Sequence, residues 1–130
     1  MALIDSWQCL GFAQIRTDTA ATDAGSIDIP SRGLGNVLKF VAVYNALGGS
    51  SATATLGVFG GAGGTGAVIV ADAALTTHTG QTVVSERTVA ATGVTPAVTA
   101  DRLYFRVGTA SGVPGSSVCV AVYGYNLPGV

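Results

Sequence analysis

Charged side chains are what this sequence has least of. Only 10% of its residues are charged, against roughly 25% in an average soluble domain, and Lys39 is its one lysine. The net charge of −1 argues against a nucleic-acid partner, because that recognition depends on lysine and arginine at phosphates. A protein surface with so few charges makes a monomer weakly soluble. We therefore expect other protein to cover part of the surface in the working state.

Long apolar runs and a leader-like N-terminus are also missing. No run reaches the length of about 18 apolar residues that a membrane-spanning helix needs, and no basic segment precedes an apolar run in residues 1–10, so we expect neither a membrane partner nor secretion. The two cysteines, Cys9 and Cys119, define neither a disulfide framework nor a metal site. We expect both cysteines to be buried and to pack as small hydrophobic residues. The alternative is a disulfide between the first and last strands.

What the chain does have is strand-forming residues punctuated by turns. Valine and threonine favour strands over helices, and 19 glycines with serine and proline separate the apolar runs. The 130 residues fit one domain, 1–130. The pattern predicts an all-β fold, a single antiparallel β-sandwich or jelly roll of about eight short strands. The expected strands are 7–15, 26–29, 38–45, 52–59, 67–71, 81–89, 102–107 and 118–125.

Alternation within these runs predicts which side chains face the core. Leu103, Phe105 and Val107 should point inward, with Tyr104 and Arg106 outward. Residues 38–45 are apolar on both faces, which suits an inner strand with both faces covered. We expect a turn in 16–24. Residues 72–78 are ambiguous, and the first four of them, 72–75, could form one helical turn capped by Asp72. Two further sets should each share a face: Trp7, Cys9, Gly11, Ala13 and Ile15, and Val118, Val120 and Val122.

One glycine-rich motif resembles a nucleotide site. Residues 61–66 match G-x-G-x-x-G, but that chemistry requires a helix to begin there, so that its amides cradle a pyrophosphate. A strand-like sequence, 67–71, follows instead. We therefore interpret the motif as a hairpin tip, where glycine tolerates positive φ.

Titratable residues form no catalytic pattern. His78, the only histidine, is expected in a solvated loop, and a hydrolase that pairs it with a nearby serine or threonine is the weaker alternative. Asp18, Asp23 and Asp28 are evenly spaced but lack the dense oxygens of a calcium loop. We interpret them as turn residues, with a loop-bound cation as the alternative. The expectation is a non-enzyme without cofactor, metal or small-molecule substrate.

Tyrosines are the best candidates for contact with a partner. Tyr104, Tyr123 and Tyr125 fall on outward or second faces of the expected strands. Such a row could be a sugar platform, a protein interface or a second packed face. Few asparagine, glutamine or acidic residues accompany them, which favours protein contact over sugar.

The end of the chain resembles a known group of viral proteins. Residues 99–107, TADRLYFRV, then a Gly/Ser loop and 118–125, VCVAVYGY, resemble small β-sandwich capsid decoration (cement) proteins of tailed bacteriophages. The resemblance implies a protein made in the host cytoplasm that binds the major capsid protein on the head surface, often as homotrimers, and stabilises it. An extended N-terminal arm is also implied, and residues 1–7 could form it with Leu3, Ile4 and Trp7 as anchors.

These expectations give two hypotheses of different classes. The first is a virion structural protein that reinforces the head by apolar burial. The second is a receptor- or carbohydrate-binding module of a phage fibre or tail, suggested by Tyr104, Tyr123 and Tyr125 together with the glycine loops.

Overall fold

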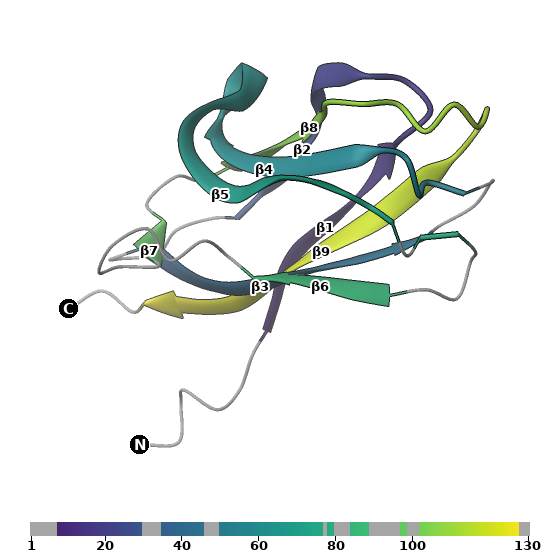
Figure 1. The fold of residues 1–130 in the computed structure, drawn as a ribbon. Coiled ribbons are helices and arrows are strands. Elements are labelled where there is room, and N and C mark those ends of the chain that lie inside the picture. The colour runs from purple at the N-terminus through teal and green to yellow at the C-terminus, as the bar shows by residue number, and fades with distance from the viewer. Residues whose placement is uncertain are drawn as a thin grey trace.

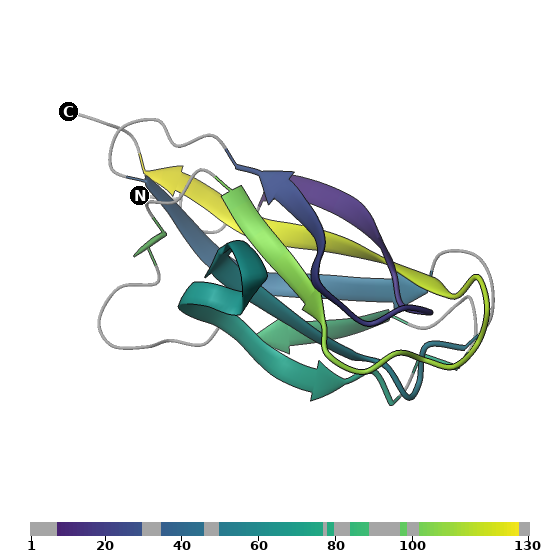
Figure 2. The same ribbon diagram turned by 90° about the horizontal axis from the view of Figure 1, so that it is seen from above.

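Two antiparallel sheets packed face to face make up the protein. The computed structural model describes residues 8–29, 35–45, 50–76, 78–79, 84–88, 97–98 and 102–127. Figure 1 views the two layers edge-on, and Figure 2 shows from above how their strands cross. The predicted all-β antiparallel sandwich is confirmed.

The five-stranded sheet has the strand order β1-β9-β3-β6, and a short β7 also pairs with β3. The other sheet has the order β2-β8-β4-β5. A 3-10 turn, η2 (Ala62–Gly64), joins β4 to β5. The strand bounds are β1 Gln8–Arg16, β2 Ala21–Asp28, β3 Gly35–Asn45, β4 Thr55–Gly61, β5 Thr65–Ala74, β6 Val84–Thr88, β7 Ala97–Val98, β8 Arg102–Val107 and β9 Ser117–Leu127.

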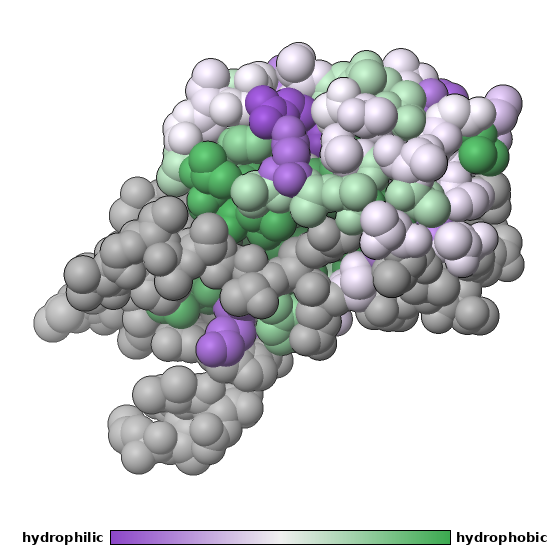
Figure 3. Space-filling view, viewed as in Figure 1, coloured by the Kyte–Doolittle hydropathy of each residue, from purple (hydrophilic) through white to green (hydrophobic). Residues whose placement is uncertain are grey.

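The core fills the space between the sheets. Leu103 and Phe105 of β8 are fully buried, as are Val118, Val120 and Val122 of β9, so the inward faces predicted for these two strands are confirmed. Figure 3 shows hydrophobic side chains gathered between the layers. The bounds of β8 agree with the predicted strand 102–107.

A bulge changes the predicted faces of β3. The register with β9 shifts between Leu38 and Phe40, so Lys39 is an extra residue that reverses the alternation at that point. Leu38 therefore joins Val41 and Val43 in the core. The prediction that Leu38 and Phe40 share a face was wrong. The expectation that both faces are covered also fails, because Phe40 is only partly buried.

A second bulge lies in β1, between Cys9 and Gly11. Because of it, Leu10 packs against the core together with Ala13, and Cys9 is exposed. The prediction of a single face running from Cys9 to Ile15 was wrong. The prediction of a buried Cys9 was also wrong, for the same reason.

Two segments have a different secondary structure from the one expected. The polar stretch predicted to be a turn contains the first half of β2, which begins at Ala21 and runs through Thr22 and Asp23. Pairing of Ala21 with Val107 and of Gly25 with Phe105 keeps this stretch in the sheet, although Asp23 between them is a poor strand former. Asp72 lies inside β5 rather than capping a helical turn.

The edge strand β5 is irregular. Its ten residues lie opposite the seven of β4, and the register shifts at three places between Leu56 and Gly61. At the hairpin tip, Gly63, Gly64 and Gly66 have φ of 70°, 77° and 71°, values that favour glycine. The interpretation of 61–66 as a hairpin tip is confirmed, because β5 and no helix follows it.

Candidate functional site

The outward side of the five-stranded sheet carries most of the partly exposed aromatic side chains. We call this surface the aromatic face. Strand pairing arranges its residues in three rows across the sheet. On β1, β9 and β3 the rows are Cys9, Tyr123 and Phe40; Phe12, Ala121 and Ala42; and Gln14, Cys119 and Tyr44. On β6 they continue at Thr88, Glu86 and Val84.

One exposed ring and one stacked pair of rings define the relief of the aromatic face. Phe12 is 73% exposed and is the most exposed large hydrophobic residue of the described chain. Phe40 and Tyr123 stack, with ring centroids 4.9 Å apart and planes inclined by 16°. Between the stacked pair and Tyr44 lies the row in which Ala121 and Ala42 follow Phe12, with Glu86 of β6 at its end. A protein partner would therefore meet alternating large and small side chains.

On β1, β9 and β3 the three rows contain no acidic or basic residue, whereas Glu86 of β6 pairs with Ala42. Cys119 lies opposite Tyr44. The pKa of the Tyr44 hydroxyl is raised, mainly by the negative charge of the Cys119 thiolate and secondly by burial. The hydroxyl therefore stays a neutral hydrogen-bonding group. This combination of uncharged aromatic and small residues is typical of the centre of a protein interface.

The register excludes a disulfide within one chain. Cys9 lies opposite Tyr123, and Cys119 lies opposite Gln14, so the two cysteines are four positions apart along β9. At about 3.4 Å per residue this is roughly 13 Å, whereas bridged Cα atoms are at most about 7 Å apart. Both thiols are free, and the alternative of a bridge between the first and last strands was wrong.

The predicted contact residues do not form one row. Tyr123 lies on the aromatic face, but Tyr104 lies in β8 on the outer side of the opposite sheet, beside Ser26 and Phe59. The backbone of Tyr125 pairs with Val37, and its side chain lies outside the described part. Leu3, Ile4 and Trp7 also lie outside the described residues.

The outer side of the four-stranded sheet is more polar. Arg102 pairs with Asp28 at 2.7 Å, and Arg106 pairs with Asp72 at 2.6 Å. The Arg106 guanidinium carbon also lies 4.4 Å from the centroid of the Phe59 ring, a distance at which a cation and a ring attract. The two outer surfaces thus differ in chemistry: the rows on β1, β9 and β3 contain no charged residue, whereas the other surface carries two ion pairs.

His78 is a buried structural residue, which corrects the prediction of a solvated loop. It is 0% exposed, and its Nε2 lies 2.9 Å from the carbonyl oxygen of Val43 and 3.3 Å from the Ser85 hydroxyl. Its backbone carbonyl accepts a hydrogen bond from the Ser51 amide at 2.9 Å. The ring thus joins the β5–β6 connection to β3 and β6, and solvent does not reach it.

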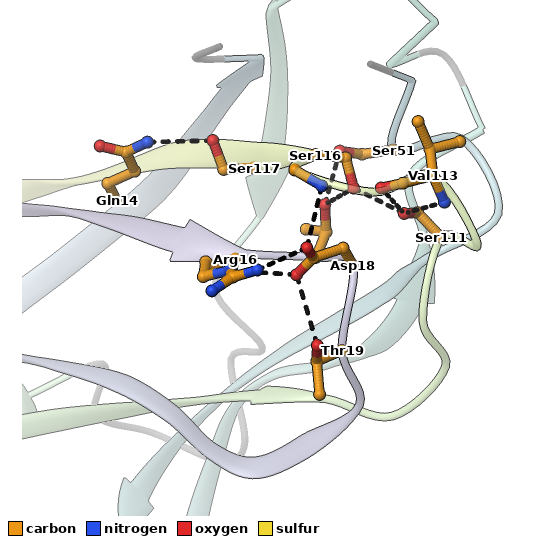
Figure 4. A network of polar contacts seen from close by, with 11 residues as sticks. Gln14, Arg16, Asp18, Thr19, Ser51, Ser111, Val113, Ser116 and Ser117 are labelled. Carbon is orange, nitrogen blue, oxygen red and sulfur yellow. Dashed lines mark hydrogen bonds and ion pairs between the residues drawn. The ribbon is translucent and has the colours of Figure 1, made fainter. Parts of the chain in front are cut away.

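Next to His78, buried hydroxyls tie the loops at one end of the sandwich together. We call Thr17, Ser51, Ser111 and Ser116 the hydroxyl cluster. Thr17 Oγ1 lies 2.8 Å from the hydroxyls of both Ser51 and Ser116. Figure 4 shows how these contacts link the turn after β1 to the loop before β9. Since each hydroxyl has a partner, the cluster satisfies polar groups that would be costly to bury alone.

The three evenly spaced aspartates do not come together. Asp18 binds Arg16 and the Gly115 amide, Asp23 accepts from the Gly63 amide at 2.7 Å, and Asp28 pairs with Arg102. Within the described residues, no group of three or more histidine, cysteine or acidic side chains is placed to hold a metal.

Asp18 gives a testable pH dependence. The pKa of the Asp18 carboxyl is lowered from 3.8 to about 2. The largest cause is the hydrogen bond from Arg16, and the second is the hydrogen bond from the Gly115 amide. Its contribution to stability is therefore present above about pH 4 and lost as the pH falls towards about 2. We expect Asp18→Asn to flatten the decline of the urea midpoint over this range. Carboxyl NMR should show the pKa rising towards 3.8 in Arg16→Gln; an unchanged value would contradict the assignment.

Sequence reasoning missed Phe12, Phe40 and Tyr44 as surface residues. The surface position of Phe12 could have been predicted, since Phe12 alternates with the inward-facing Ala13 and Ile15. The positions of Phe40 and Tyr44 could not, because the bulge at Lys39 decides their face. None of the described segments forms a helix of the length and hydropathy that crossing a membrane takes. Comparisons with protein-family models, curated proteins and solved structures found no match.

Proposed function

We propose that this chain is a non-enzymatic virion structural protein that binds the outer surface of a capsid head, together with copies of itself, and stabilises it. The observation that carries the proposal is the aromatic face, where aromatic and small residues lie on β1, β9 and β3 and Phe12 is 73% exposed. Burying apolar surface contributes about 25 cal/mol per Å² before the cost of association. Many copies on a symmetric head would multiply a modest contact.

Two further observations support a structural rather than a catalytic role. The one histidine is fully buried and held by Val43 and Ser85, so it offers no general base to a substrate in solvent. The low charge of the chain, 10%, suits a protein whose surface is shared with neighbours. The resemblance to decoration proteins agrees with this role.

Heating of heads tests the proposal. Heads purified from particles made with and without the chain should release their DNA at different temperatures, several degrees higher when the chain is bound. Adding the purified chain back to depleted heads should restore the higher temperature. An unchanged release temperature, with the chain shown to be on the heads, would contradict the stabilising role.

A receptor- or carbohydrate-binding module is the second candidate. The stacked Phe40 and Tyr123 rings, with Tyr44 and Gln14 nearby on the same face, favour it, because sugars stack on aromatic rings and bind neighbouring polar groups. Binding on a glycan array that is lost in Tyr123→Ala would favour this candidate. No binding on the glycan array and no effect on host-cell adsorption would together exclude this candidate.

A further inference from the structure

One margin of the five-stranded sheet is open to a further strand. β1 stands at the end of the strand order, and from Gly11 to Arg16 it pairs with β9 without a register shift. We infer that an extended, uncharged segment of another protein adds to the outer side of β1 as an additional strand. The inference goes beyond the proposed function, because it names the chemistry of a partner and does not require that partner to be a capsid.

The hydrogen-bond pattern shows which backbone groups of β1 face outward. The Thr17 amide donates to the Ser116 carbonyl at 3.0 Å, and this pair continues the β1–β9 register. Bonded and non-bonded pairs alternate in an antiparallel ladder, so the residues of β1 on the core side of Thr17 bond to β9. Those with exposed side chains direct their N–H and C=O groups away from β9. They are Phe12, Gln14 and Arg16.

These outward groups are left for a partner. Within the described part of the chain, no backbone hydrogen bond reaches Phe12, Gln14 or Arg16 from the open side of β1. A strand laid along this side could exchange both backbone bonds with each of the three residues. Strand addition of this kind takes its affinity from the main chain and its specificity from alternate side chains.

The other margins carry features that discourage strand addition. β5 shifts register at three places, and β6 and β7 have only five and two residues. β2 has a register shift and carries Asp23 and Asp28. From Gly11 to Arg16, β1 has no proline, no acidic residue and no bulge. Among the described strands, β1 thus offers the longest regular margin without such protection.

The exposed ring of Phe12 lies on the same strand. A side chain inside a sheet has neighbours on both adjoining strands, whereas Phe12 has one on β9, Ala121, and none on its open side. The ring therefore stays mostly exposed. Arg16, the only charged residue of β1, is already paired with Asp18 at 2.6 Å. These two features favour an uncharged segment with an apolar side chain beside Phe12.

Hydrogen exchange of single amides, followed by NMR, tests the geometry. In the free chain the amides of Phe12 and Gln14 should exchange at least about 100-fold faster than those of Ala13 and Ile15. The probe is a peptide with the sequence of residues 117–124 carrying Cys119→Ser, because this strand already pairs with β1 on its other side. At about 1 mM the peptide should slow exchange at Phe12 and Gln14 about tenfold.

Methylated peptides test whether backbone bonds carry the binding. Only one alternate set of the peptide's amides can face β1, so N-methylation of that set should abolish the protection and N-methylation of the other set should preserve it. This comparison uses the unaltered chain, so it does not depend on the folding of any variant.

Gln14→Pro tests the same groups from the side of the chain. Proline is tolerated at a sheet margin where its nitrogen faces solvent, so the variant should fold and lose the peptide. Gln14→Ala is the matched control, because it loses the same side-chain contact with Ser117 but keeps the amide. It should bind the peptide within about twofold of the parent chain.

Several results would overturn the inference. They are slow exchange at Phe12 and Gln14 in the free chain, no protection by the peptide, equal binding of the two methylated peptides, and equal loss in the two Gln14 variants. Protection that appears without peptide as the chain concentration rises would mean that a second copy occupies β1, which also overturns it. Because none of these measurements uses heads, such results would leave the proposed function standing.

Discussion

Phe105→Ala should lower the free energy of unfolding by about 3–5 kcal/mol, a loss comparable to the whole stability of a marginal domain. Phe105 is 0% exposed and is the largest fully buried side chain of the described chain. It lies in β8, between β2 and β4, so no loop can collapse into the space its ring leaves. Urea unfolding followed by circular dichroism would measure the change.

Phe12→Ala is the matched control for this prediction. It removes the same ring from a site that is 73% exposed, so its effect should stay within about 0.5 kcal/mol. Both variants should be unfolded at the same low protein concentration, about 1 μM, so that association of copies adds nothing to the measured stability. Equal losses in the two variants would mean that the placement of Phe105 in the core is wrong.

Gly124→Ala should cost about 3 kcal/mol or more, although it adds one methyl group. A Cβ at this position would overlap the carbonyl oxygen of Val37 and lie 2.9 Å from its carbonyl carbon. The obstacle is the backbone of β3, which cannot rotate away as a side chain can. The variant should form little folded protein at the growth temperature, and thermal melting should show a large fall in midpoint.

Gly60→Ala provides the comparison in the neighbouring sheet. Its Cβ would meet Ala67 at 3.5 Å and beyond, in ordinary contact. Restricting the unfolded chain should then leave stability unchanged or raise it by up to about 1 kcal/mol. A Gly124→Ala protein as stable as Gly60→Ala would show that β9 and β3 are not as close as described.

Much of the fold could be predicted because some strands follow a simple rule. In β8 and β9 each core residue alternates with an outward one, as Leu103 does with Tyr104. In β3 and β1 one extra residue, Lys39 or Leu10, reverses the alternation, and single-sequence periodicity carries no signal of such a bulge. β2 was partly missed because Asp23 is a poor strand former, and the stretch around it is held only by the flanking pairs of Ala21 with Val107 and Gly25 with Phe105.

The candidate site was harder to predict, for the same physical reason. Tyr104 and Tyr123 both point outward from their strands, yet they lie on different sheets, and only the order of strands decides this. His78 lies in a threonine-rich segment that looks solvated. Its burial depends on the carbonyl of Val43 and the hydroxyl of Ser85, which approach it only in the folded chain.

The irregular spacing of β5 has a consequence for how copies can associate. A flat outer strand offers evenly spaced amide and carbonyl groups on which the strand of another molecule can grow a continuous ladder, the first step towards a fibril. In β5 the ten residues opposite seven of β4 break that spacing. Where copies are concentrated, joining of sheets side by side through β5 is thereby disfavoured. Growth of a continuous ladder on β5 is resisted even though this strand carries few charges.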